Sequence, residues 1–254
     1  MSLIFYKTLA ALLILITSLI AVAYPIKLRA SAKHHPFLEL ADAFASGIFL
    51  GAALFHMLPD AVKEFRLYLG ENPYPLAELC CATGFLILLF LERLSQHAPL
   101  VKKSVHAVPY MIAVILIIHS LIEGAVLGIN TTFATAAVIF VAIIAHKSSE
   151  SFALAVILNR SQLTLTRIIV IVSLFSIMTP LGIIFGTTLT EFLQFKIVGL
   201  ITAGFNAFAA GTFLYMSTLH HLNHHHRLNE AESLREFFFL LIGLTIMALL
   251  ALWA

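Results

Sequence analysis

Eight apolar runs, each about as long as a membrane is thick, follow one another along this chain of 254 residues. A helix needs about 20 apolar residues to cross the hydrocarbon core of a bilayer. The runs cover residues 3–24, 40–62, 76–94, 107–129, 133–158, 168–189, 196–216 and 236–253. Because they use up the chain, we expect one all-α transmembrane domain over residues 1–254, with eight transmembrane helices and its function inside the bundle.

Composition and charge support this class. The chain is 61% hydrophobic and 11% charged, whereas soluble domains carry about 25% charged residues. The net charge of +2 gives no reason to expect a nucleic-acid partner, so the expected surroundings are the lipid bilayer. Ala21-Val22-Ala23 resembles a signal-peptide cleavage site. The preceding apolar run is long for a signal, however, and we interpret it as a retained first helix.

Lysine and arginine indicate the orientation. The segments that follow the first, third, fifth and seventh runs hold ten of these residues, and the opposite side holds four. Cytoplasmic loops carry the excess of positive charge. We therefore expect both termini to be extracytoplasmic.

A weak internal repeat relates the second and seventh runs. Residues 42–58 align without gaps to residues 206–222 with eight identical pairs, including His56 with His220. The two runs point in opposite directions, so the repeat would be an inverted one, which is common in transporters.

Two ionisable doublets lie inside the fourth and fifth runs. His119 and Glu123 are four residues apart, as are His146 and Glu150, and on a helix such pairs share one face about 5–6 Å apart. A charge inside a membrane costs at least about 2.5–3.5 kcal/mol. Imidazole and carboxylate bind first-row divalent metals, and four of them nearly complete a tetrahedral shell. We therefore predict an intramembrane metal site.

Residues beside the doublets refine this prediction. Gly124 and Gly128 allow a neighbouring helix to approach closely, and we expect that neighbour to be the fifth run. Lys147 is at a spacing that allows it to pair with Glu150. A fixed cation disfavours a second dication, so we expect one metal ion. Ser120, next to His119, is a candidate accessory ligand.

Two further polar clusters could serve the same ion. His56, Met57 and Asp60 form a candidate access site near the end of the second run, although solvation of a helix end explains them equally well. Histidines after the seventh run form a candidate cytoplasmic exit site, or a solvated loop: His220, His221, His224, His225 and His226.

Enzymatic motifs are absent from the sequence. It contains no H-E-x-x-H, no G-x-S-x-G and no G-x-x-x-x-G-K-[ST]. We therefore expect neither an enzyme nor an ATP-driven pump. An intramembrane metalloenzyme with Glu150 as its general base remains an alternative without a supporting motif.

The motifs together resemble the ZIP (Zrt/Irt-like) family of divalent metal transporters. HSLIEGAVLGI from residue 119 is similar to that family's HSxxEGxxxG signature, and HKSSE from residue 146 to its HKxxE motif. Residues 49–61, 180–186 and 209–215 match further family patterns. The resemblance implies a 3+2+3 inverted-repeat bundle, elevator-like transport, and a main site made of both doublets.

The chain also departs from the family pattern. Members with two metals carry Asn, Asp and Glu where this chain has Ser120, Lys147 and Thr179. The resemblance therefore identifies Lys147 and Thr179 as residues that suppress a second site. His220 stands where many members have an acidic residue.

We expect import of a divalent metal into the cytoplasm by secondary or facilitated transport, with Zn²⁺ favoured over Fe²⁺, Mn²⁺, Co²⁺ and Cd²⁺. The alternative is a metal-gated channel or membrane metal sensor on the same bundle. A multi-pass location in the cell membrane is expected, in a bacterial inner membrane rather than a eukaryotic plasma membrane. A homodimer is left open.

Overall fold

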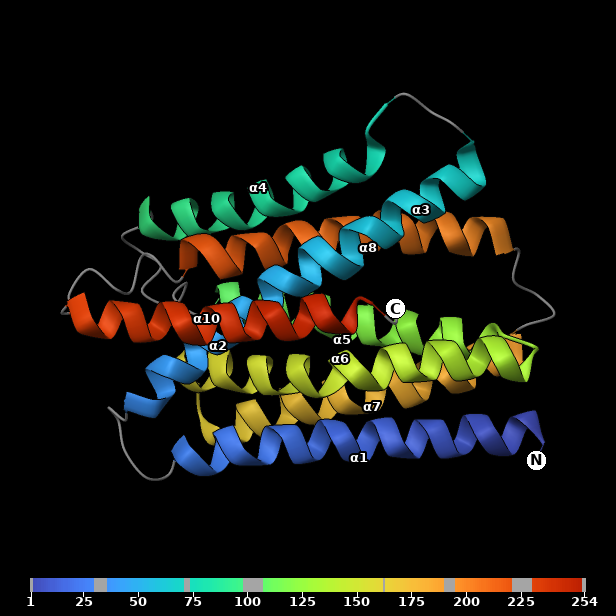
Figure 1. Ribbon diagram of the computed structural model, residues 1–254, viewed down its shortest axis with the longest axis horizontal. Helices are drawn as coiled ribbons and strands as arrows, with labels where there is room; N and C mark the ends of the chain where they lie inside the picture. The colour runs from blue at the N-terminus through green and yellow to red at the C-terminus, as the bar shows by residue number, and fades with distance from the viewer. Residues whose placement is uncertain are drawn as a thin grey trace. The chain divides into compact units, whose positions relative to one another are not determined.

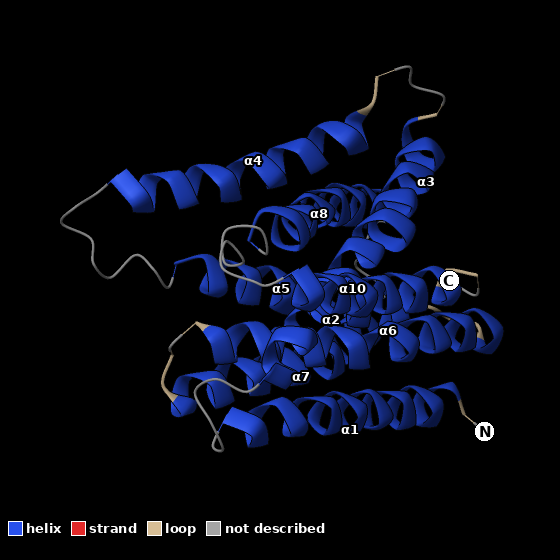
Figure 2. Ribbon diagram, turned by 60° about the vertical axis from the view of Figure 1, so that its left-hand side comes forward, coloured by secondary structure: helices blue, strands red, loops and turns tan. Residues whose placement is uncertain are grey.

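The computed structural model describes residues 2–29, 36–70, 74–97, 107–161, 163–189, 195–220 and 230–252, and the described secondary structure is helical (Figures 1 and 2). This agrees with the all-α expectation, because a chain in hydrocarbon must pair its backbone polar groups internally. The eight expected spans fit eight helical rods. The second rod is longer than expected, since helical structure continues from residue 36 to 69 through a π-helical turn.

The helices form two compact units. The first unit contains α1 (Leu3–Arg29), most of α5 (Ala107–Ile129), α6 (Phe133–Arg160) and α7 (Leu165–Leu189). The second unit contains α2 (Pro36–Ala52), η1 (Ala53–Met57), α3 (Leu58–Leu69), α4 (Leu76–His97), α8 (Phe195–Tyr215), η3 (Met216–His220) and nearly all of α10 (Glu230–Leu250).

Among the described residues, six segments are long and apolar enough to cross a membrane. They are Leu3–Lys27, Glu39–Leu69, Pro109–Ile129, Phe133–Arg160, Leu165–Thr188 and Gly199–Thr218. The helices α4 and α10 fall outside this set.

Helix ends in both units have local causes. The α6 helix begins after Thr132, whose side-chain oxygen accepts a hydrogen bond from the Thr135 amide at 3.3 Å, as N-cap residues do. The α3 helix ends at Gly70, whose φ of 76° suits a residue without a Cβ atom.

The first unit holds its helices together by a small apolar core and a glycine contact. Side chains from all four helices meet in the core, which contains Ala10, Ile14, Leu127, Ala136, Ile143 and Ile183. Gly124 and Gly128 of α5 face the backbone of α7 at Gly182 and Gly186. Our expectation that these glycines contact α6 was therefore wrong. The α7 helix has its own pair of glycines four residues apart, and the two pairs let the α5 and α7 backbones touch.

The second unit is built around α8, which packs along α4 and α3 (Figure 1). Gly84 and Gly211 bring the α4 and α8 backbones together, and Gly47 and Gly243 do the same for α2 and α10. The hydroxyl of Tyr215, which is fully buried, donates a hydrogen bond to the Glu92 carboxylate.

Two π-helical turns interrupt rods of this unit. In η1 the amide of Leu58 donates to the carbonyl of Ala53, five residues back. The turns η1 and η3 contain His56 and His220. These are the matched histidines of the internal repeat. Such turns are rare and occur mainly as inserted single turns in helices.

Substitution of Gly182 should disturb the α5–α7 contact. A Cβ atom at this position would overlap the carbonyl oxygen of Leu121. We expect Gly182→Ala to destabilise the protein by about 1–3 kcal/mol, as overpacking does, and to weaken metal binding by moving α5. Gly204→Ala is the matched control, because the nearest atom to its Cβ would be 4.0 Å away. Thermal unfolding and metal titration in detergent would measure both, and an unchanged Gly182→Ala protein would contradict the expectation.

Candidate metal site

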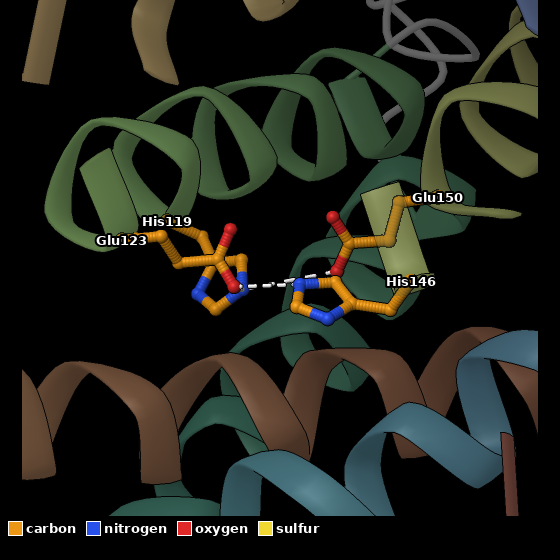
Figure 3. Close-up of side chains that lie close together, drawn as sticks. All are labelled: His119, Glu123, His146 and Glu150. Atoms are coloured by element: carbon orange, nitrogen blue, oxygen red, sulfur yellow. Dashed lines mark hydrogen bonds and ion pairs between the residues drawn. The ribbon is translucent and has the colours of Figure 1, made fainter. Parts of the chain in front are cut away.

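The two doublets meet inside the first unit. His119 and Glu123 lie on one face of α5, and His146 and Glu150 lie on one face of α6. Figure 3 shows the four side chains pointing toward one another. One potential ligand atom from each lies within 4.8 Å of the others. In a tetrahedral zinc site such atoms are about 3.4 Å apart, so ligation would require a contraction of roughly an ångström.

Glu123 joins the two imidazoles. Its Oε1 atom is 3.0 Å from Nε2 of His119 and 2.7 Å from Nε2 of His146 (Figure 3). In a neutral imidazole protonated at Nδ1, Nε2 carries a lone pair, so the Nε2 atoms of His119 and His146 could instead bind a cation. Glu123 is therefore the residue that couples α5 to α6.

Glu150 is fully buried, with an exposed fraction of 0%. Among the described residues neither carboxylate oxygen has a hydrogen-bond partner. Nε2 of His119 lies 3.7 Å from the Oε1 atom of Glu150. A buried carboxylate without hydrogen bonds is strongly disfavoured. Its position beside three other ligand groups makes a bound cation the simplest compensation.

Lys147 lies beside the site, where it attracts Glu150 electrostatically, but among the described residues it makes its direct contacts with other groups. Its ammonium group donates a hydrogen bond to Oγ of Ser120 at 2.5 Å and lies 3.8 Å from the ring centre of Phe175. Ser120 in turn donates to the Leu116 carbonyl at 2.7 Å. A cation over an aromatic face is favourable in a dry site. No spacing pattern in the sequence pointed to Phe175, which comes from α7.

The remaining candidate residues belong elsewhere. Thr179 lies buried on α7, with its carbonyl against Gly124. In the second unit, Nδ1 of His56 lies 3.0 Å from Oδ2 of Asp60, Lys63 also contacts Asp60, and Met57 is buried. The backbone of His220 lies in η3, and its side chain lies outside the described part of the structure. His221, His224, His225 and His226 lie outside the described residues.

Comparisons with known proteins agree with this architecture. The family profile described as "ZIP Zinc transporter" matches residues 5–105 and 96–251. The chain belongs to the ZIP zinc transporter family. Membership indicates a multi-pass membrane protein that transports divalent metal ions rather than an enzyme.

Individual relatives align over most of their length. Zinc transporter ZIP1 of Danio rerio is 31% identical over 261 aligned positions, which cover 85% of each chain. Zinc transporter ZIP2 of Mus musculus is 27% identical and covers 89% of this chain and 88% of its own. Fe(2+) transport protein 1 of Arabidopsis thaliana is 26% identical, over 83% of this chain and 73% of its own.

Replacement of Glu150 by glutamine should separate binding from stability. The amide keeps the shape but removes a buried charge, so we expect the metal-free protein to become more stable. Metal affinity should fall by at least about 100-fold, because a ligand contributes more than the outer-shell groups whose loss costs 10–100-fold. Glu78→Gln, on an exposed position of α4, is the control. Isothermal titration and thermal unfolding would measure the two effects, and parallel losses of both would argue against a metal ligand.

Proposed function

We propose that this ZIP family member imports a divalent metal, with Zn²⁺ as the principal ion, into the cytoplasm through a mononuclear intramembrane site. The proposed ligands are His119, Glu123, His146 and Glu150. The main support is that one ligand atom from each of the four side chains lies within 4.8 Å of the others. In addition, the buried Glu150 carboxylate accepts no hydrogen bond from the described residues. Two imidazoles and two carboxylates suit zinc, and the relatives include proteins named as zinc and iron(II) transporters.

A single metal ion is supported by the surroundings of Lys147. Its ammonium group occupies the space beside Ser120, and a fixed positive charge a few ångströms away repels a second dication. Ser120 and Thr179 also supply no carboxylate. The intramembrane site is therefore proposed to hold one ion.

An elevator-like movement is the proposed transport mode. The support is that all four ligands belong to one compact unit, which could carry the ion without exchanging ligands. Charge asymmetry supports termini outside and inward transport. The 3+2+3 inverted repeat is supported by the eight identical pairs and by π-turns at nearly matched positions, Ala53–Met57 and Met216–His220. His56 and Asp60 remain candidates for an access site, and the histidines from His220 to His226 for the exit.

Uptake by reconstituted vesicles tests the function. We expect Zn²⁺ uptake to saturate with concentration and to be abolished by Glu123→Ala or His146→Ala, since each removes one of four ligands. Glu78→Gln provides a control for reconstitution. Uptake that stays linear past millimolar metal would favour a channel, and binding without flux would favour a sensor. Near-normal uptake by both alanine variants would refute the proposed site.

The stoichiometry is tested by rebuilding the second site. Lys147→Asp together with Thr179→Glu removes the cation and adds two carboxylates, so we expect a second intramembrane ion to bind. The background should carry replacements of His224, His225 and His226, so that loop binding does not contribute. Metal content by mass spectrometry should rise from one ion per chain to two. Two intramembrane ions in the protein with Lys147 and Thr179 intact would contradict the proposal.

A further inference from the structure

The first helix supplies no ligand, yet its buried polar groups contact all three other helices of its unit. The Lys7 ammonium donates a hydrogen bond to the Gly128 carbonyl of α5 at 2.5 Å. Ser18 Oγ lies 2.9 Å from Ser151 Oγ of α6 and 2.8 Å from Ser176 Oγ of α7. Lys7 is 6% exposed and Ser18 is 0% exposed. Such groups are costly in an apolar bundle and are expected to have a defined role.

Lys7 fixes the C-terminal end of α5. The last four carbonyls of a helix lack partners inside it, and together they form the negative end of the helix dipole. Gly128 is one residue from the end of α5, so its carbonyl can accept from another helix. Lys7 supplies this charged donor, whereas the single proton of Thr187 Oγ1 on α7, 3.3 Å from the same carbonyl, has a closer acceptor at 2.7 Å in the Ile183 carbonyl of its own helix. A short, charge-assisted hydrogen bond in a buried position is strong and directional, which sets the position of α5 along its axis.

Ser18 fixes α6 through a directed chain of hydroxyl groups. Ser151 Oγ donates its single proton to the Lys147 carbonyl at 2.6 Å. A serine hydroxyl has one proton, so Ser18 must donate to Ser151 and accept from Ser176. The chain therefore runs from α7 through α1 to α6. It ends beside two residues of the site, because Ser151 directly follows Glu150 and the accepting carbonyl directly follows His146.

These two contacts relate the two metal-bearing helices to each other. Lys7 and Ser18 are separated by about 16 Å along α1, and Gly128 lies about 7.5 Å beyond Glu123 along α5. The α1 helix thus holds α5 at one level and α6 at another. Glu123 Oε1 must reach both imidazoles, at 3.0 and 2.7 Å. Ligand geometry tolerates displacements of only about 0.5 Å, so a small axial slip of α5 against α6 would disturb the site.

We propose that Lys7 and Ser18 are positioning residues that set the axial register of α5 against α6, and thereby the metal affinity of the site. This inference rests on the proposed function of the four ligands.

The test uses the full chain in detergent with Co²⁺ as the metal probe, because its absorption spectrum reports ligand number and geometry. We expect Lys7→Met and Ser18→Ala each to weaken Co²⁺ binding by about 10–100-fold, as loss of supporting groups does in other metal sites, and to change the absorption band. Lys7→Arg should restore most of the affinity. Lys7→Gln, which keeps a donor but lacks the charge and reach, replaces Lys7→Met if the latter does not fold.

Matched controls lie on the same helix. In the part of the chain that the structure describes, the hydroxyls of Thr8 and Thr17 donate to carbonyls of α1 itself, those of Ile4 and Leu13. Thr8→Val and Thr17→Val should therefore leave affinity and spectrum within about twofold of the parent. Ser176→Ala removes the α7 contact but keeps the Ser18–Ser151 bond, so its effect on affinity should be small.

Two outcomes are decisive. If Lys7→Met and Ser18→Ala lower the unfolding midpoint but bind Co²⁺ with the parent affinity and spectrum, α1 contributes stability alone and the inference is wrong. If the His146→Ala variant binds Co²⁺ as well as the parent protein does, the proposed metal site itself is wrong. This result does not depend on any α1 variant, so it can be told apart from failure of the α1 inference.

Discussion

Two buried carboxylates, Glu123 and Glu150, determine what the rest of the first unit must do. A negative charge removed from water is strongly disfavoured unless other charges or hydrogen bonds compensate it. Glu123 obtains compensation from two imidazoles, whereas Glu150 accepts no hydrogen bond among the described residues. The proposed metal site is therefore poised to take up positive charge. Under this proposal, the surrounding helices must hold the two carboxylates close enough together for one ion to contact both.

That closeness is achieved without large side chains. Glycines on α5 and α7 place the two backbones in contact, and a small apolar core joins all four helices of the unit. Polar links from α1 then fix the helices along their axes, a direction in which apolar packing is weakly specific. Lys147, held between Ser120 and the Phe175 ring, places its amino group beside the site. Packing thus sets lateral distances, and buried hydrogen bonds set the register.

Much of this arrangement could be predicted from residue spacing, because spacing along a helix determines which residues share a face. Spacing was enough to predict the helices and to predict that His119 shares a helix face with Glu123, and His146 with Glu150. It could not identify partners between helices. The spacing of Gly124 and Gly128 indicates a close neighbour but not which one, and the structure has α7 where we expected α6. The i, i+3 spacing favoured Glu150 as the partner of Lys147, but tertiary packing gave it Ser120 and Phe175. Lys7 contacts the backbone carbonyl of Gly128, and because every residue has such a carbonyl, the residue type at position 128 does not indicate the contact.

The glycine contact also limits how such a protein can evolve. Where α5 meets α7 at Gly124 and Gly128, the neighbouring atoms belong to the backbone, so there is no side chain to exchange gradually. Substitution of these two glycines is therefore unfavourable. Changes of ion preference must arise at residues around the proposed site whose side chains can vary. Ser120, Lys147 and Thr179 are such residues, and all three are fully buried. A lineage could therefore diversify its chemistry at these positions while the helix framework stays constant.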